Sequence, residues 1–308
     1  MLLSSLLNAL PGAVAQGLIW GIMAIGVYIT FRVLDIADLS VDGTMCTGAA
    51  VCVMMVQSGK NVWIAMLIAV AAGLLVGLAT GIFHTAFGIP AILAGILTQL
   101  ALWGVNLKIM GKANQPFSRG SEILITLKHV RGVPFYQNPI FIVAIFAALL
   151  ILLLYFFFGT ELGSSIRATG CNENMAKAQG INTNLNKVLG LMISNAIVAF
   201  SSALLSQYQG FCDINMGKGA IVIGLAACII GEAIFGKIFK NFGLSLVAVA
   251  FGAVIYFIVL QVVIWLGVDT DLLKLFQALV VALFLAFPYW KKKYFTKPKS
   301  VYAAKEVK

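Results

Sequence analysis

Long apolar runs separated by short polar segments dominate the chain. Several runs, such as residues 139–158, extend for about 20 residues, which is the length that an α-helix needs to cross the hydrocarbon core of a bilayer. Membrane-spanning β-strands would instead alternate apolar and polar residues over segments of about ten residues. The pattern therefore predicts an all-α membrane protein, a polytopic helical bundle.

About nine spans are expected, and together they form a single transmembrane domain over residues 1–308. The second and seventh spans are short for a full crossing, which predicts short broken helices there. The nine segments are 11–31, 43–58, 62–83, 89–110, 139–158, 188–206, 219–235, 243–264 and 272–290.

Composition supports this class. The chain is 61% hydrophobic and 10% charged, whereas a soluble domain is about 45–50% apolar and about 25% charged. Its mean hydropathy is +1.00. A water-soluble globule of 308 residues could not bury so much apolar surface. A cytosolic enzyme, a disordered chain and a fibrous repeat are therefore excluded.

The basic residues predict the orientation. Seven of the 21 lie after Trp290, in the tail 291–308, and a basic tail beside a span is typical of the cytoplasmic side. If the C-terminal tail is cytoplasmic and each span reverses the side of the membrane, 13 of the 21 basic residues lie on the cytoplasmic side. The N-terminus then lies outside. The net charge of +10 thus reflects topology rather than a nucleic-acid partner, although the tail could also contact membrane lipids.

One segment fits this orientation poorly. Residues 111–138 form the longest outside segment and carry four basic residues against the single acid Glu122. They also contain the apolar stretch 123–127. A loop that dips partly into the membrane and meets an external partner would explain this composition. An error in the predicted topology is the alternative.

The two short spans begin alike, which predicts an internal repeat. The first reads DLSVDGTMCTGAAVC from Asp38 to Cys52, and the second reads DINMGKGAIVIGLAAC from Asp213 to Cys228. Five predicted spans separate the two starts, so the copies would have opposite orientation. We therefore expect an inverted repeat with halves 11–138 and 188–290, a pattern that points to a transport site. Chance similarity between apolar sequences is the alternative.

Polar residues at these two starts are candidates for a translocation pathway. Ionisable groups at membrane depth are costly and usually face a protein cavity. A short helix beginning at such a cavity offers free N–H groups to an anion such as a carboxylate. A solvated interfacial loop with ordinary helix caps is the competing interpretation. The candidate pathway residues are Asp38, Ser40, Asp42, Gly43, Thr44, Asp213, Asn215 and Gly217.

The sequence contains no set of residues that indicates an enzyme or a metal site. His84 and His129 are isolated, and the five cysteines include no C-x-x-C pair. Residues 231–238 match the phosphate-loop pattern G-x-x-x-x-G-K, but Ile238 stands where Ser or Thr must bind Mg²⁺. We expect no catalytic residues and no cofactor in this chain.

Four segments carry a resemblance to a known family. LDIADLSVDGTMCTGAA (34–50), GIPAILAGILTQLALWGVNLKIMGKAN (88–114), SIRATGCNENMAKAQGINTN (165–184) and IVIGLAACIIGEAIFG (221–236) resemble permeases of ABC transporters of the branched-chain amino acid and ribose type. Within that type, the sequence is most similar to permeases of tryptophan/tyrosine importers. The resemblance covers residues 11–290, and the DLSVDGT and RATG segments are its most specific parts.

The resemblance implies an importer in a bacterial plasma membrane that moves a small solute, an aromatic or branched-chain amino acid, by alternating access. Its implied partners are cytoplasmic ATP-binding subunits that hold ATP and Mg²⁺, an extracellular substrate-binding lipoprotein and a second permease copy in a homodimer. An ion-coupled secondary amino acid transporter is the alternative function. A membrane subunit without transport is disfavoured by the polar residues within spans, such as Gln99 and Asn195.

The resemblance also implies that the cytoplasmic loop 159–187 docks on the ATPase as a coupling helix. The sequence fits, because Asn172 to Gln179 can form a short helix that Gly180 ends, and because Ala168 and Ala176 are small enough for close docking. A merely connecting loop is the alternative. The residues at the family's recurring positions are Arg167, Gly170, Asn172, Ala176, Gly180, Ile181 and Asn182.

Glu232 departs from the ribose-type pattern, which is rich in glycine in this region. The side chain could pair with Lys237 at the inner edge of its span, or it could line the pathway as an inner gate. The sequence leaves both roles open.

Overall fold

The computed structural model describes residues 2–117, 123–125, 138–236, 238–239, 241–268 and 272–290. Within them lie eleven α-helices, one π-helix and two short strands. The helices are α1 Leu2–Tyr28, α2 Val41–Gln57, α3 Val62–Thr85, α4 Ala91–Met110, α5 Pro139–Gly159, α6 Glu161–Cys171, α7 Glu173–Ala178, α8 Thr183–Gln209, α9 Ala220–Phe235, α10 Phe242–Trp265 and α11 Leu273–Trp290. The π-helix η1 (Ile29–Val33) continues α1, and the strands are β1 Asn114–Pro116 and β2 Phe211–Asp213.

The predicted all-α class is confirmed, and each of the nine predicted spans coincides with a helix. Six of these helices are long and apolar enough to cross a membrane: α1 with η1, α3, α4, α5, α8 and α10. The remaining three, α2, α9 and the segment Leu273–Phe284 of α11, are apolar but shorter. A count of nine full crossings therefore stays a prediction.

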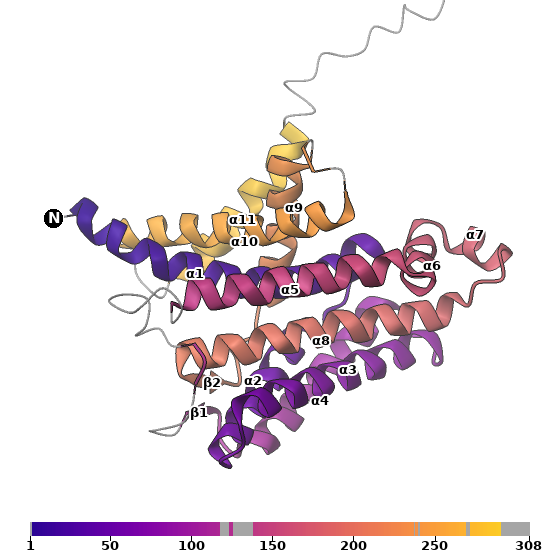
Figure 1. The fold of residues 1–308 in the computed structure, drawn as a ribbon, viewed down its shortest axis with the longest axis horizontal. Helices are drawn as coiled ribbons and strands as arrows, with labels where there is room; N and C mark the ends of the chain where they lie inside the picture. The colour runs from indigo at the N-terminus through magenta and orange to yellow at the C-terminus, as the bar shows by residue number, and fades with distance from the viewer. Residues whose placement is uncertain are drawn as a thin grey trace, which may run out of the picture.

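The helices form two interlocked groups (Figure 1). α8 packs against α2 and α3, while α1 packs against α9 and α10. The first helix of each predicted half thus lies against the second and third helices of the other half. α1 and α8 also cross each other, where the Ser194 hydroxyl donates a 2.7 Å hydrogen bond to the Gly26 carbonyl oxygen.

Glycines allow the backbones of paired helices to approach closely. A Cβ added to Gly17 of α1 would lie 2.7 Å from the Val254 Cα of α10. On the other side of the bundle, a Cβ at Gly77 of α3 would collide with the Leu191 carbonyl oxygen of α8. Because lipid tails are as apolar as side chains, such close packing is a main source of helix association in a membrane.

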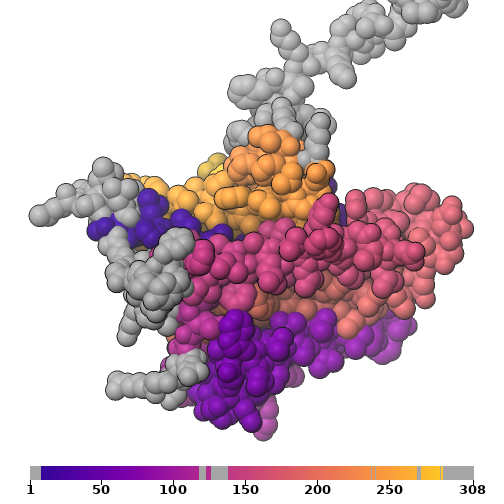
Figure 2. All heavy atoms as spheres, viewed as in Figure 1, coloured from indigo at the N-terminus to yellow at the C-terminus, as the bar shows by residue number. Residues whose placement is uncertain are grey.

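α5 is the least buried of the six long apolar helices, whereas α8 is nearly as buried as α1, which is the most buried at 78%. The most apolar stretch of α5 has a mean hydropathy of 3.1 and is 17% buried, whereas that of α8 is 72% buried. Figure 2 shows α5 spread across the visible face of the molecule. We infer that α5 faces lipid and that α8 forms the centre of the bundle.

The described part of the loop 111–138 packs against the bundle. β1 pairs antiparallel with β2, with Asn114 opposite Asp213. Ile125 is 1% exposed, and the Leu124 N–H donates a 3.2 Å hydrogen bond to Gln207 Oε1 of α8. Residues 124 and 125 of the apolar stretch thus pack on the bundle, and the dipping of this loop into the membrane stays a prediction. Arg119, Lys128 and Arg131, like the tail 291–308, lie outside the described residues.

Candidate functional site

A buried polar network surrounds the chain segment that enters α2. Asp38 Oδ1 accepts hydrogen bonds from the Ser40 N–H (2.9 Å) and the Ser40 hydroxyl (2.6 Å). Asp38 Oδ2 accepts a 2.8 Å bond from the Asn195 side-chain amide. The Asn195 oxygen in turn accepts a 2.5 Å bond from the Thr44 hydroxyl. Three of the predicted pathway residues therefore share one network.

This network lies deep in the bundle. Asn195 is 0% exposed and Asp38 is 2% exposed. Asn195 stands near the centre of α8, which runs from Thr183 to Gln209, so the network lies close to the middle of a membrane-spanning helix. An ionisable residue at that depth is retained where its polar atoms have partners, and here three hydrogen-bond donors satisfy the Asp38 carboxylate.

The two predicted repeat starts meet directly. Asp42, in the first turn of α2, accepts a 2.9 Å hydrogen bond from the Gly219 N–H at Oδ2 and a 3.0 Å bond from the Ile221 N–H at Oδ1. These N–H groups form the N-terminus of α9, where a negative charge is stabilised by the helix dipole. A Cβ at Gly217 would collide with the Asp42 carbonyl oxygen, so only glycine fits there.

This contact corrects one expectation. The sequence predicts that a helix start in this region offers free N–H groups to the carboxylate of a solute. At α9, the Asp42 carboxylate already occupies two of those groups. The sequence could not reveal this because the two partners are 177 and 179 positions apart.

The remaining pathway candidates lie elsewhere. Asp213 belongs to the β1–β2 region, where its carboxylate accepts bonds from the Asn215 N–H (2.8 Å) and the Asn114 amide (3.4 Å). Gly43 faces α4, because a Cβ there would lie 2.8 Å from Leu102 Cδ1. The structure therefore brings Asp42 and Gly217 together but keeps Asp213 and Asn215 apart from the Asp38 network.

The predicted coupling loop contains two helices instead of one. α7 (Glu173–Ala178) lies where a short helix is expected, and the Asn172 side chain caps it by accepting a 3.0 Å bond from the Met175 N–H. Gly180 follows α7 with φ = +78°, a conformation that favours glycine. α6 was not predicted, although Thr160 is a residue type that favours helix N-caps: its hydroxyl caps α6 by accepting a 3.3 Å hydrogen bond from the Gly163 N–H.

An ion-pair cluster holds α7 against α8. The Glu173 carboxylate lies 2.8 Å from Lys187 Nζ of α8 and 3.0 Å from Lys177 Nζ. Hydrogen bonds from Lys187 and then Lys177 lower the pKa of Glu173 to about 2. The Asn182 side chain caps α8 itself, accepting a 3.1 Å bond from the Leu185 N–H. The position of α7 is therefore tied to the first turn of α8.

The exposed side of α7 is not the one that the sequence suggests. Ala176 is 0% exposed, so it packs inward and offers no contact to a docking partner. The Ile181 N–H donates a 3.1 Å hydrogen bond to the Ala176 carbonyl oxygen. Met175, in contrast, is 48% exposed, and α7 projects from one end of the molecule (Figure 1). Arg167 is turned toward the bundle, 5.3 Å above the Phe242 ring.

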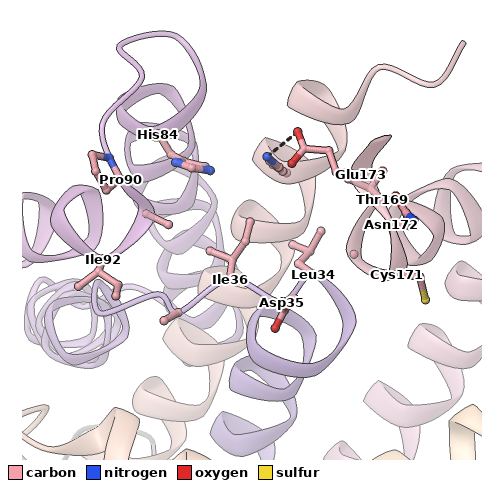
Figure 3. Close-up of a pocket in the computed structure, with 14 residues that line it drawn as sticks. Leu34, Asp35, Ile36, His84, Pro90, Ile92, Thr169, Cys171, Asn172 and Glu173 are labelled. Carbon is pink, nitrogen blue, oxygen red and sulfur yellow. Dashed lines mark ion pairs between the residues drawn. The ribbon is translucent and has the colours of Figure 1, made fainter. Parts of the chain in front are cut away.

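α6 packs directly on the end of the first helix. A Cβ at Gly170 would collide with the Val33 carbonyl oxygen of η1. Next to this contact lies a cavity of about 580 Å³. Figure 3 shows Leu34, Asp35 and Ile36 on one wall, His84 and Pro90 on another, and Thr169 to Glu173 opposite them.

Glu232 pairs with a residue far away in the sequence. Its carboxylate lies 2.9 Å from Arg32 Nε of η1. Lys237, the expected partner, lies outside the described residues. The Arg32–Glu232 pair joins the end of α9 to η1, and the role of Glu232 as an inner gate stays a prediction.

The fold and these sites define a multi-pass helical membrane protein of the transporter class. Residues 10–287 match the family described as branched-chain amino acid transport system / permease component, and the chain belongs to this family. It is therefore an ABC-type permease, a transport subunit rather than an enzyme. The resemblance found in the sequence is confirmed.

Individual relatives agree with this assignment. The tyrosine transport system permease protein of Clostridioides difficile is 38% identical over 280 residues, which cover 91% of each chain. The ribose import permease protein RbsC of Escherichia coli K12 is 28% identical and covers 86% of each chain. Among solved structures, PsaBC from Streptococcus pneumoniae in complex with Fab superposes with a TM-score of 0.54 at 17% identity, covering 94% of this chain and 99% of that chain. This last similarity concerns the fold alone.

Proposed function

We propose that the chain is the permease subunit of an ATP-driven importer for an amino acid, with an aromatic or branched-chain side chain as the first class to test. The name of the 38% identical tyrosine transport permease supports an aromatic solute. The more distant ribose permease places sugars second. The solute would cross by alternating access.

The observation that carries a coupled mechanism is the packing of Gly170 on η1. The segment that follows η1 contains Asp38 and leads into α2, so a displacement of α6 and α7 would reach the buried network through one continuous chain of contacts. Packed elements of this kind transmit motion because they have few alternative arrangements. We assign α7 as the element that docks on an ATPase.

The inverted repeat is part of the proposal, and paired contacts support it. Cys52 and Cys228, which the two repeat sequences align, make equivalent interactions. The Cys52 thiol donates to the Ala203 carbonyl oxygen of α8 at 3.8 Å, and the Cys228 thiol donates to the Ala24 carbonyl oxygen of α1 at 3.6 Å. In both cases the second helix of one half binds the first helix of the other. Asp42 lies where the two halves meet.

The proposed assembly contains this chain twice, two cytoplasmic ATP-binding subunits that carry ATP and Mg²⁺, and an extracellular substrate-binding lipoprotein. The end of the bundle with α6 and α7 would face the cytoplasm, as would the C-terminus. The β1–β2 end and the N-terminus would face outward, where the binding protein delivers the solute.

Uptake into proteoliposomes tests the function and separates it from ion-coupled transport. The permease is reconstituted with its ATPase and binding protein, with ATP inside the vesicles or outside them. Labelled tyrosine, leucine and ribose are compared in the presence of an ionophore. We expect amino acid uptake that requires ATP on the ATPase side and survives the ionophore. Uptake that the ionophore abolishes and ATP does not affect would support a secondary transporter.

A further inference from the structure

Two sulfur atoms are in contact near the junction of the two repeat starts, and a second cysteine packs against the same segment. Cys212 Sγ, at the centre of β2, lies 3.7 Å from Met216 Sδ. Cys46, one turn beyond Asp42 in α2, belongs to the same buried apolar cluster as Cys212. Each thiol also contacts the other segment's backbone, Cys46 Sγ at 3.8 Å from the Asp213 carbonyl oxygen and Cys212 Sγ at 4.0 Å from the Cys46 carbonyl oxygen.

We propose that Cys46, Cys212 and Met216 form a binding site for a soft monovalent metal ion, Cu(I) or Ag(I). Thiolate and thioether sulfurs are the ligands that select such ions. No group of three His, Cys, Asp or Glu side chains that could hold a metal ion occurs among the described residues. The thioether of Met216 therefore supplies the third ligand and distinguishes this site from a zinc site, whose ligands are Cys, His and carboxylates.

The spacing of the sulfurs suits a three-coordinate ion. If a metal–sulfur bond is about 2.3 Å long, as for zinc–thiolate bonds, ligands in a trigonal plane lie about 4.0 Å apart. The distance of 3.7 Å between Cys212 Sγ and Met216 Sδ is close to this value. Cys212 and Met216 would therefore need to move apart only slightly, while Cys46, whose Sγ lies 3.8 Å from the Asp213 carbonyl oxygen, would turn toward the ion.

The surroundings favour an ion of charge +1. Cys46 is 2% exposed and Cys212 is 0% exposed, within an apolar cluster that also contains Met110 of α4. Binding forms one bond to a cysteine thiolate, which releases one thiol proton to water, and two bonds to neutral sulfurs, the other cysteine thiol and the Met216 thioether; no electrons are transferred. The product is electrically neutral, so it can remain in this apolar environment. The nearby Asp213 carboxylate already accepts bonds from Asn215 and Asn114.

The site has a route of entry and joins two segments. Met216 is half-buried and its neighbour Asn215 is exposed, so an ion can reach the sulfurs from the segment between β2 and α9. The bound ion would link α2 to that segment one turn from the Asp42–Gly219 contact. It would thereby hold the two repeat starts together.

Silver binding to the full-length protein tests the site. The background variant is Cys171→Ser, because Cys171 is the exposed cysteine. The reduced, detergent-solubilised protein is incubated with Ag(I) without oxygen, desalted, and analysed for silver by mass spectrometry. We expect one retained Ag(I) per chain, loss of that ion in Cys212→Ser, and at least about tenfold weaker binding in Met216→Leu. Cys228→Ser is the matched control with another buried cysteine and should retain the ion.

The conservative Met216→Leu variant keeps the test decisive if Cys212→Ser does not fold. It also separates a metal site from a simple pair of thiols, since Met216 takes no part in thiol oxidation. Failure of the background protein to retain silver would overturn the proposal. The proposal would also be overturned if the Cys171→Ser background, Cys212→Ser and Met216→Leu all retained the same amount of silver.

Discussion

The carboxylate of Asp42 caps a helix that begins 178 residues later, accepting a 2.9 Å hydrogen bond from the Gly219 N–H and a second bond from Ile221. Two short helices, α2 and α9, are thereby joined start to start within the bundle. A fixed anion at a helix N-terminus satisfies the N–H groups and interacts favourably with the helix dipole. The contact therefore links the two halves of the chain where an inverted repeat would place its centre.

Replacing Asp42 should loosen this junction. Asp42→Asn removes the negative charge and leaves one acceptor oxygen for two N–H groups, so we expect a loss of about 1–2 kcal/mol. This corresponds to a fall of about 2–4 °C in Tm. Asp35→Asn is the control, because Asp35 is exposed with φ = +56°, and asparagine accepts that conformation. Thermal unfolding in detergent measures both, and equal Tm values would contradict the role of Asp42 as a cap.

Two buried asparagines should differ sharply in their effect on stability. Asn195→Leu leaves the buried Asp38 carboxylate short of a donor, and such an unsatisfied group costs about 1–3 kcal/mol or more. Asn106 is equally buried, but its side-chain oxygen makes no hydrogen bond to the described residues, and its amide makes one at 3.3 Å. Asn106→Leu should therefore be nearly neutral. Similar losses of Tm in the two variants would argue against the Asp38 network.

The contact between α6 and η1 should tolerate no side chain. Gly170→Ala places a Cβ against the Val33 carbonyl oxygen, and overpacking of this kind costs about 1–3 kcal/mol. Gly159→Ala, at the end of α5, meets no atom within 4 Å and serves as the control. We expect Gly170→Ala to lower both Tm and ATP-driven uptake, and Gly159→Ala to change neither. An active, fully stable Gly170→Ala protein would rule out this contact as the mechanical link.

The position of α7 should depend on pH through Glu173. Its pKa in the folded protein, about 2, lies below the ordinary value of 4.5. A lowered pKa stabilises the folded arrangement above the ordinary value, and this stabilisation is lost as the pH falls from about 5 toward 2. A nitroxide on the exposed Cys171 should report an ordered α7 from pH 8 to 5 and increasing mobility below. Glu173→Gln should be mobile throughout, and a pH response that persists in this variant would exclude Glu173 as its origin.

The span positions were predictable because each depends on a local property. An apolar run of sufficient length must form a helix in a bilayer, since no water is present to bind its backbone. The ranges 62–83 and 139–158, for example, correspond to α3 Val62–Thr85 and α5 Pro139–Gly159. The short helix expected over residues 172–179 and its stop at Gly180 were equally local; α7 spans Glu173–Ala178, and Gly180 follows it with φ = +78°.

The contacts that build the sites were not predictable in this way. Asp42 binds α9, Glu232 pairs with Arg32, and Asp38 binds Asn195, each across more than 150 positions. Nothing in a single sequence specifies such partners, because they depend on how the two helix groups interlock. The inward orientation of Ala176 was missed for the same reason: a six-residue helix does not reveal which face its neighbours cover.

ATP-driven uptake by a variant of α7 tests most directly whether this chain is a permease moved by a separate ATPase. Met175→Glu puts a charge on the exposed apolar side chain of α7, while Leu162→Glu makes the same change at a similarly exposed position in α6. In proteoliposomes that contain the ATPase and the binding protein, we predict that Met175→Glu abolishes uptake while the variant remains inserted and folded. Leu162→Glu should retain it. Uptake by Met175→Glu equal to that of the unmodified protein, or uptake that continues without ATP, would contradict the proposed coupling.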